Sequence, residues 1–232
     1  MASKGAGEDQ VRQEAVTDSG LEVVGTTVGQ VAENSFTVWK DGSDRAVMID
    51  PGDEPDRLMA PLAERGLTLD AILLTHCHFD HIGAVAPIAR ATGAPVYCPE
   101  IEVGVLADIM TYVPWPGFGP FESWEAEETV TGGEKLELAG LEFDVIHTPG
   151  HSPGHVTYSL PEFGVVFSGD VLFQGSVGRV DLPGGDWETL LGSLKLLVES
   201  HPPETTVYPG HMGVTTIGAE LAGNPFLAGI EV

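Results

Sequence analysis

The segment Thr75–His81 carries three histidines and one aspartate, and no other part of the chain constrains the fold as strongly. It follows an apolar run at residues 71–74, which is predicted to be a short buried strand. It precedes a stretch of small residues at 82–92, which is predicted to be a helix. Loops at strand ends are where α/β folds place their chemistry. Because imidazole and carboxylate groups suit zinc, iron or manganese, the segment predicts a metal site.

Alternation along this loop predicts which side chains face the metal. In an extended loop, His76, His78 and Asp80 project to the same side. Asp80 and His81 can then turn into a second cluster where the helix begins. Cys77 lies between two expected ligands and is predicted to face the hydrophobic core. The chain has only two cysteines, too few for a disulfide framework.

Three further strand ends carry a side chain that can bind a metal. In each, an apolar strand is followed by a small or turning residue and then by a histidine or an aspartate. The three segments are Thr148-Pro149-Gly150-His151, Ser168-Gly169-Asp170 and Tyr208-Pro209-Gly210-His211. One such segment is weak evidence. Four strand ends that together deliver five histidines and two carboxylates predict one composite metal site.

The rest of the chain alternates between strand and helix patterns. Residues 1–18 are expected to be a flexible polar lead, and residues 19–232 one domain. Strands are predicted at 21–27, 31–39, 46–49, 71–74, 95–98, 135–138, 141–146, 156–160, 165–168 and 206–208. Helices are predicted at 55–65, 82–92, 101–110, 186–199 and near 215–222. This order predicts an α/β sandwich with helices outside two sheets.

The charge balance excludes several classes of partner. The chain has 10 basic and 35 acidic residues, which gives a net charge of −25. A surface this acidic repels phosphate backbones and anionic lipids, so neither nucleic-acid binding nor membrane binding is expected. No apolar run approaches the ~20 residues that span a bilayer, and no secretory signal is visible. A cytoplasmic protein is therefore expected.

With these motifs the chain resembles the metallo-β-lactamase superfamily, and within it the short, single-domain glyoxalase II-like hydrolases. The resemblance covers about residues 20–228. It rests on His76-x-His78-x-Asp80-His81, Thr-Pro-Gly-His151-Ser-Pro-Gly-His155, Ser-Gly-Asp170, Gly-Arg179-x-Asp181 and Tyr-Pro-Gly-His211. It implies a four-layer αββα sandwich with two divalent metal ions at the edge of the two sheets.

The resemblance also implies how the ligands are divided between the two metals. The first metal would be held by His76, His78 and His151. The second would be held by Asp80, His81 and His211. Asp170 would bridge the two.

Physical chemistry gives the same division of labour. Two divalent cations about 3.5 Å apart need a shared anion, which an aspartate and a hydroxide supply. That hydroxide is the expected nucleophile, and Asp80 and Asp170 are the candidate catalytic residues. Zinc is the expected metal, with iron or manganese as alternatives.

The remaining histidines are predicted to have supporting or structural roles. His155 is predicted to be structural, His147 to belong to a strand or to support the site, and His201 to lie at the surface. Asp50 matches a family position that supports the metal loop from outside the ligand set. Arg179 is expected to form a buried ion pair with Asp181.

The C-terminal region, which binds the substrate in glutathione-thioester hydrolases, differs in this chain. Those enzymes carry a basic, tyrosine-bearing C-terminal region, whereas the tail after His211 contains no lysine, arginine or tyrosine. The thiol carrier therefore stays open. The aromatic stretch 112–124 is expected to form a wall or lid over the metal cleft, or else to pack its rings onto the body of the domain. The candidate substrate residues are Tyr112, Trp115, Phe118 and Arg179.

Two functions fit these ligand positions. The first is a hydrolase that cleaves a small-molecule thioester or related ester. The second is a persulfide dioxygenase with one iron held by His76, His151 and Asp170. The flanking residues favour the hydrolase, because His155 stands where the dioxygenases are expected to carry cysteine. A lactonase or another esterase is a further alternative. A β-lactamase is not expected, because those enzymes generally lack the bridging carboxylate of Asp170. The oligomeric state stays open.

Overall fold

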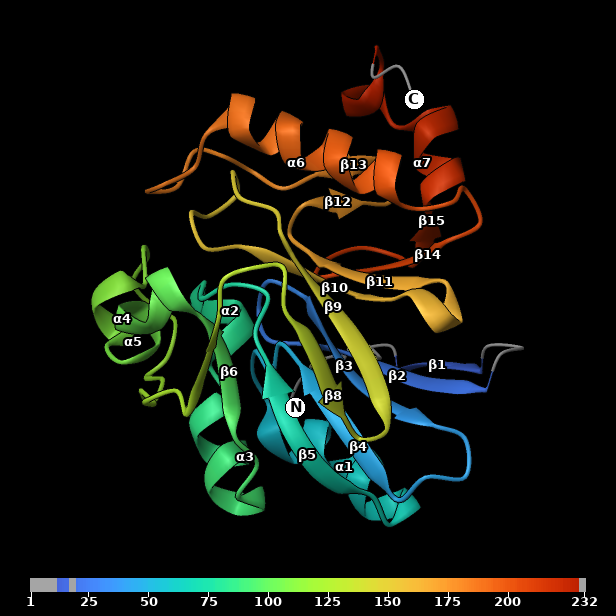
Figure 1. Cartoon of the computed structure of the whole chain (residues 1–232). Coiled ribbons are helices and arrows are strands. Elements are labelled where there is room, and N and C mark those ends of the chain that lie inside the picture. The colour runs from blue at the N-terminus through green and yellow to red at the C-terminus, as the bar shows by residue number, and fades with distance from the viewer. Residues whose placement is uncertain (1–11, 17–19, 230–232) are drawn as a thin grey trace, which may run out of the picture.

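The computed structural model describes residues 12–16 and 20–229, and it has the expected four layers. Two sheets pack face to face at the centre of the molecule. One outer layer is formed by α1 (Pro55–Arg65) and α3 (Val85–Thr92), and the opposite one by α6 (Trp187–Ser200) and α7 (Ile217–Gly223) (Figure 1). The predicted αββα sandwich is therefore confirmed.

The first sheet has seven strands in the order β1-β2-β3-β4-β5-β6-β7. Its strands are β1 (Arg12–Val16), β2 (Leu21–Val28), β3 (Glu33–Lys40), β4 (Arg45–Ile49), β5 (Thr68–Leu73), β6 (Val96–Pro99) and β7 (Glu128–Val130). The meander β1 to β4 is antiparallel, and β4 to β7 pair in parallel. The parallel half places the carboxyl end of β5 at the edge where the metal loop begins.

The second sheet has six strands in the order β15-β14-β11-β10-β9-β8. Its strands are β8 (Lys135–Leu138), β9 (Leu141–His147), β10 (Val156–Leu160), β11 (Val165–Gly169), β14 (Thr206–Pro209) and β15 (Thr215–Thr216). A separate hairpin joins β12 (Leu172–Phe173) to β13 (Ser176–Val177). β11 and β14 pair in parallel, so their carboxyl ends lie side by side.

Short helical turns complete the chain. They are α2 (Phe79–Ile82), η1 (Glu100–Glu102), α4 (Val103–Leu106), α5 (Ile109–Tyr112), η2 (Pro161–Phe163) and η3 (Pro225–Leu227). Among the helices of the described residues, none is long and apolar enough to cross a membrane.

Side-chain alternation along the strands builds the core in three parts. On β4, Val47 and Ile49 face the core between the sheets, whereas Met48 faces the helices α1 and α3. On β11, Val165 and Phe167 face the inter-sheet core and Val166 faces α6. Both faces of these central strands are buried, which explains their nearly continuous apolar sequence.

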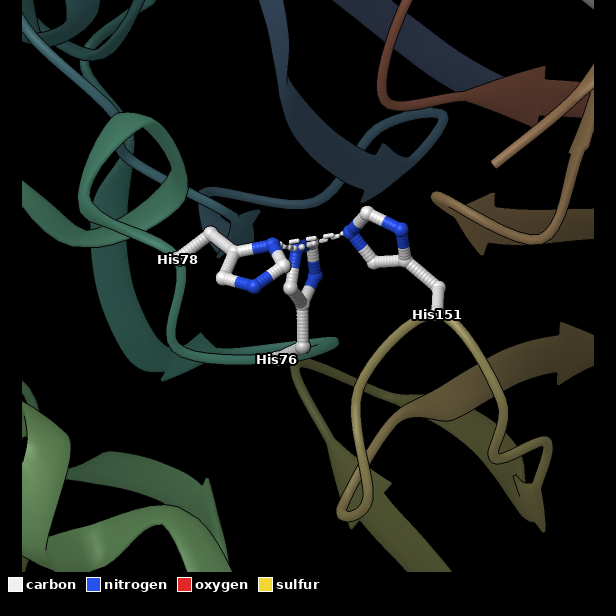
Figure 2. Close-up of side chains that lie close together, drawn as sticks. All are labelled: His76, His78 and His151. Carbon is white, nitrogen blue, oxygen red and sulfur yellow. Dashed lines mark hydrogen bonds between the residues drawn. The ribbon is translucent and has the colours of Figure 1, made fainter. Parts of the chain in front are cut away.

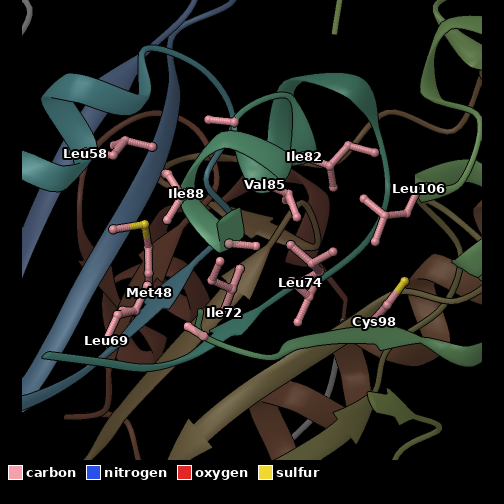
Figure 3. Close-up of a cluster of buried hydrophobic side chains, with 14 of the residues drawn as sticks. Met48, Leu58, Leu69, Ile72, Leu74, Ile82, Val85, Ile88, Cys98 and Leu106 are labelled. Atoms are coloured by element: carbon pink, nitrogen blue, oxygen red, sulfur yellow. The ribbon is translucent and has the colours of Figure 1, made fainter. Parts of the chain in front are cut away.

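The hydrophobic cluster between the first sheet and the helices α1 and α3 packs against the metal loop. Leu58 of α1 and Ile88 of α3 pack against Met48 and Ile72, as Figure 3 shows. Cys98 and Leu106 belong to the same cluster. The cluster reaches Cys77 of the metal loop, so the packing fixes the backbone that carries the histidines.

Several local features differ from the sequence-based predictions, among them the strand β7, which was not predicted. Residues 12–16, expected in a flexible lead, form β1, because they pair with β2 along five residues. The rest of that lead, at residues 1–11 and 17–18, lies outside the described residues. The helix expected over 82–92 is divided into α2 and α3. The helix expected over 101–110 is divided into η1, α4 and α5, because Asp108 has φ −148° and ψ 57°, which is not helical. The glycine-rich loop at 169–185 contains the hairpin β12–β13.

The inter-sheet core predicts a clear contrast between adjacent residues of β9. Phe143 is fully buried between the sheets, whereas its neighbour Glu142 is exposed on the other face. Phe143→Ala should lower the free energy of unfolding by about 3–5 kcal/mol because it leaves a cavity. Glu142→Ala should change it by less than about 0.5 kcal/mol. Urea unfolding measures both, and equal effects would contradict this packing.

Candidate metal centre

The predicted ligands come from four strand ends that meet at one edge of the sandwich. His76 and His78 follow β5, and His151 follows β9. Asp170 follows β11, and His211 follows β14. Asp80 and His81 lie in α2, which begins at Phe79. The extended alternation predicted for the loop therefore ends at His78, and Asp80 lies with His81 and His211, as predicted for the second cluster.

The first cluster consists of His76, His78 and His151, whose ring nitrogens point toward one another (Figure 2). His76 Nε2 lies 3.1 Å from His78 Nδ1 and 3.2 Å from His151 Nε2. His151 Nε2 lies 2.8 Å from His78 Nδ1. Three nitrogens that converge in this way can share one cation, which is how imidazoles bind zinc or iron.

The second cluster consists of Asp80, His81 and His211. His211 Nε2 lies 3.3 Å from Asp80 Oδ2, and His81 Nε2 lies 3.8 Å from the same oxygen. His81 is fully buried, whereas Asp80 and His211 are partly exposed. The second cluster is therefore partly accessible to solvent through these two side chains.

Asp170 lies between the two clusters. Its Oδ2 is 3.4 Å from His151 Nε2 of the first cluster and 3.5 Å from His211 Nε2 of the second. Its Oδ1 is 3.4 Å from His81 Nε2. The carboxylate thus lies close enough to ligand nitrogens of both clusters to bridge two cations, which is the position predicted for it.

Two buried polar atoms at this point fit a divalent cation. His81 Nε2 and Asp170 Oδ1 have no hydrogen-bond partner among the described residues. Buried polar groups normally have a hydrogen-bond partner. A cation between these two atoms would therefore remove the free-energy cost of burying them without one. Gly210 leaves the space open, because a Cβ there would lie 2.4 Å from Asp170 Oδ1. The donor set and its surroundings therefore fit divalent metal ions, whose identity the arrangement does not fix.

The pKa values of the first cluster suit metal binding, whereas that of His81 in the second cluster is shifted in the opposite direction. Burial and the neighbouring His151 lower the pKa of His78 to about 4, so its nitrogen lone pair is free at neutral pH. Burial lowers the pKa of His76 well below its usual value in the same way. Burial acts to lower the pKa of His81 too, but the Asp170 and Asp80 carboxylates raise it well above the usual value. The second cluster is therefore surrounded by excess negative charge.

Contacts outside the ligand set orient the imidazoles. Asp50 accepts hydrogen bonds from the Thr75 backbone N–H at 2.7 Å and from the Thr75 hydroxyl at 2.6 Å. Its Oδ2 also lies 3.0 Å from His81 Nδ1. The Thr75 hydroxyl can then accept from His76 Nδ1, 3.0 Å away, which leaves Nε2 for a metal. The structure therefore places Asp50 where a supporting role was predicted.

His151 and His155 have different tasks although they share one loop. The Nδ1–H of His151 is held by the Arg179 carbonyl at 2.8 Å, which leaves its Nε2 for a metal. His155 Nε2 accepts a hydrogen bond from the Asp170 backbone N–H at 3.0 Å. Its Nδ1 contacts the Thr148 hydroxyl at 3.0 Å. His155 therefore fixes the backbone of the predicted ligand Asp170, which is a supporting role at the site and not only the structural role predicted for it.

The aromatic stretch 112–124 packs beside the metal loop. The ring of Phe79 lies 4.9 Å from that of Phe118, 5.9 Å from Phe121 and 6.3 Å from Trp115, measured between centroids. Phe79 stands between His78 and Asp80 in the sequence. These rings form an aromatic wall on Phe79, and Phe118 and Phe121 pack against the core under the metal loop, as the second alternative predicted. That the wall covers the metal cleft stays a prediction. Tyr112, at the end of α5, is 56% exposed, and its substrate role stays a prediction.

Arg179 connects the aromatic wall to the first cluster. Its guanidinium lies 5.5 Å from the centroid of the Trp115 ring, and its carbonyl holds His151. It donates two hydrogen bonds to Asp181, at 2.6 and 2.7 Å. The pair was expected to be buried, but both side chains are about half exposed or more. The loop ends at the protein surface, so the charges stay in contact with water.

The other histidines and the cysteines stand outside the clusters. His147 is the last residue of β9, as predicted. His201 ends α6 and is partly buried, because Ser159 Oγ and the Leu197 carbonyl hold its two nitrogens. It was expected at the surface, and the structure leaves it partly exposed there. Cys77 is buried against Cys98 in the core, as predicted, and burial raises the pKa of its thiol.

Two buried acids near the centre had not been singled out from the sequence. Glu33, at the start of β3, lies 3.9 Å from His81 Nδ1, and burial raises its pKa well above the usual value. Glu102, in η1, accepts hydrogen bonds from both loops of the first cluster. Neither residue belongs to a motif, and the residues around each look like those of an exposed segment. The sequence therefore did not indicate that these carboxylates are buried.

The sequence family agrees with this geometry. Residues 28–211 match the model of the metallo-beta-lactamase superfamily. The chain belongs to this superfamily. It is 38% identical over 210 residues to the probable metallo-hydrolase YqgX of Bacillus subtilis, a match that covers 88% of this chain and 97% of that protein. It is 36% identical over 213 residues to the hydroxyacylglutathione hydrolase GloC of Haemophilus influenzae, covering 89% and 97%. These relatives make the chain a glyoxalase II-like metallo-hydrolase.

Solved structures of this superfamily share the fold. The BLEG-1 B3 metallo-beta-lactamase is 40% identical, with a TM-score of 0.84 and coverage of 89% of this chain and 100% of that one. TTHA1623, in a di-iron-bound form, is 45% identical, with a TM-score of 0.78 and coverage of 88% and 99%. ETHE1 from Myxococcus xanthus is 30% identical, with a TM-score of 0.72 and coverage of 94% and 85%.

The arrangement predicts different outcomes for two histidines. His211→Ala should remove one of two bound metal equivalents, because His211 Nε2 faces Asp80 and Asp170. His201→Ala should keep the metal content of the wild type, because its partners Ser159 and Leu197 belong to no cluster. Metal analysis of the purified variants measures both. Equal metal content in the two variants would show that the ranking of these histidines is wrong.

Proposed function

We propose that this metallo-hydrolase binds two divalent cations and cleaves a small-molecule thioester or a related ester. The observation that carries the proposal is the position of Asp170, whose oxygens face the nitrogens of both histidine clusters. Such an arrangement suits two cations that share one carboxylate. Zinc is the proposed metal, and iron or manganese suits the same donor set.

Each cluster has a proposed role. His76, His78 and His151 would hold one cation, and Asp80, His81 and His211 the other, with Asp170 shared. Bound divalent cations supply a water that deprotonates near neutral pH and polarise a carbonyl group. The chain keeps its ligands in place through Asp50, Thr75 and His155, which contact the ligand residues from outside.

The substrate side of the proposal rests on the aromatic wall and on the charges around Arg179. Trp115, Phe118 and Phe79 present apolar surface beside the clusters. Arg179 is a cation at the border of the site, in a chain whose net charge is −25. Because this guanidinium is already paired with Asp181, it offers an anionic acyl or thiol group little net attraction, and the protein as a whole repels such a group. Small acyl thioesters with modest demands on the thiol are therefore the proposed substrates, in a cytoplasmic setting.

Metal analysis combined with turnover tests the proposal. Wild-type protein should carry two metal equivalents and hydrolyse an acyl-glutathione thioester. Asp170→Ala should lose most of this activity and the shared cation while keeping its far-UV circular dichroism spectrum, because Asp170 lies in a loop. One iron per chain with oxygen uptake on a persulfide would instead support a dioxygenase. Hydrolysis of a β-lactam in place of the thioester would also overturn the proposal.

The aromatic wall should act mainly on substrate binding. Contacts that are equal in the ground state and the transition state change KM, whereas the metal centre determines kcat. Trp115→Ala or Phe118→Ala should therefore raise KM several-fold with little change in kcat. Replacing glutathione by a smaller thiol should do the same. Steady-state kinetics with one acyl group on both thiols measures these effects.

Trp187 provides a matched control for these variants. It is 37% exposed, close to the 40% of Trp115, but it packs against Phe226 and lies in α6. Trp187→Ala should leave both KM and kcat unchanged. A collapse of kcat with the smaller thiol would reveal a dedicated site for the carrier and would contradict the proposed loose recognition of the thiol.

A further inference from the structure

Glu102 is a buried carboxylate that touches both loops of the first histidine cluster. It ends the 3₁₀ turn η1 and is 5% exposed. Its Oε2 accepts a hydrogen bond from the Cys77 backbone N–H at 2.6 Å. Its Oε1 accepts from the Ser152 hydroxyl at 2.6 Å and from the Gly154 backbone N–H at 2.7 Å. One side chain thus binds two loops that lie far apart in the sequence.

The partners of Glu102 are immediate neighbours of predicted ligands. Cys77 stands between His76 and His78, and Ser152 directly follows His151. The spacing of the two loops decides whether the three ring nitrogens converge, since two of them come from one loop and the third from the other. Any change in the Glu102 contacts would therefore move the ligands of one loop relative to the ligand of the other.

The local sequence accommodates this carboxylate closely. A Cβ at Gly154 would lie 2.7 Å from Glu102 Cγ and 2.9 Å from its Oε1, so a larger residue there would displace the Glu102 side chain. All three partners donate, and a carboxylate only accepts, so the group matches its surroundings fully. A backbone hydrogen bond from Val156 to Thr75, 2.8 Å long, joins the strands behind the loops. Glu102 joins the loops themselves.

We propose that Glu102 is a positioning residue that sets the distance between the His76–His78 loop and the His151 loop and thereby the affinity of the first metal position. This inference rests on the metal centre of the proposed function and adds to it a residue outside the ligand set. The second cluster takes its ligands from α2 and from the loop after β14, with Asp170 beside them, and none of these residues contacts Glu102 in the hydrogen bonds described above. The effect of Glu102 should therefore be confined to one position.

Glu102→Gln is the informative substitution, because it keeps the shape and replaces one accepting oxygen with a donating amide. Whichever way the amide turns, its NH₂ group faces an N–H or O–H donor. Substitutions of groups that orient metal ligands typically reduce metal affinity 10- to 100-fold. Of the two zinc affinities of the chain, we expect one to fall by about this factor and the other to stay unchanged.

Zinc titration of the full chain against a chromophoric chelator measures both affinities without any substrate. The His211→Ala background, in which only the first position should remain, identifies which of the two is weakened. Glu100→Gln is the matched control, because Glu100 lies in the same turn and is exposed. Ser152→Ala removes one donor with little change in volume and should weaken the same position by a smaller factor. Circular dichroism and urea unfolding of the zinc-free variants report on the fold.

The outcomes separate this inference from the proposed function. Unchanged zinc affinities in Glu102→Gln, or an equal loss at both positions, would overturn the positioning role. So would a loss of the same size in Glu100→Gln. Wild-type protein that binds two zinc ions but cleaves no thioester would refute the proposed substrate and leave the positioning role intact. Wild-type protein that binds no zinc at the first position would refute both.

Discussion

The packing of the two sheets against each other is the interaction on which the rest of the structure depends. Phe143, Tyr158 and Phe167 fill the space between the sheets, and Tyr158 also donates a hydrogen bond to the Leu74 carbonyl at the end of β5. This contact ties the second sheet to the start of the metal loop. The ends of β5, β9, β11 and β14 therefore meet at one edge, although they belong to different sheets.

At that edge the electrostatic balance favours cations. Imidazoles crowd together in the first cluster with lowered pKa values, and carboxylates surround His81 in the second. Buried polar atoms of His81 and Asp170 have no hydrogen-bond partner among the described residues. Divalent cations at both clusters would compensate this arrangement.

The residues that hold the ligands in place come from different segments of the chain. Asp50 orients Thr75 and His81, His155 holds the backbone of Asp170, and Glu102 joins the loops of the first cluster. Each acts through a hydrogen bond to a group next to a ligand or to the ligand itself. The geometry of the centre is therefore determined by the whole edge of the sandwich, including η1, and the ligand motifs alone do not fix it.

The sequence by itself determined the ligand types, their order along the chain and the sandwich, because apolar strands followed by histidine or aspartate are local patterns. Asp80 was already expected in the second cluster, and only the tertiary structure decided that α2 begins at Phe79, so that Asp80 and His81 both lie in that helix. The breaks near Asp108, the exposed Arg179–Asp181 pair and the roles of Glu33 and Glu102 also came from the structure. Glu102 meets partners 25 and 50 residues away, and such contacts leave no periodicity or motif in the sequence. Burial of a carboxylate is decided by what folds over it, which a linear pattern does not record.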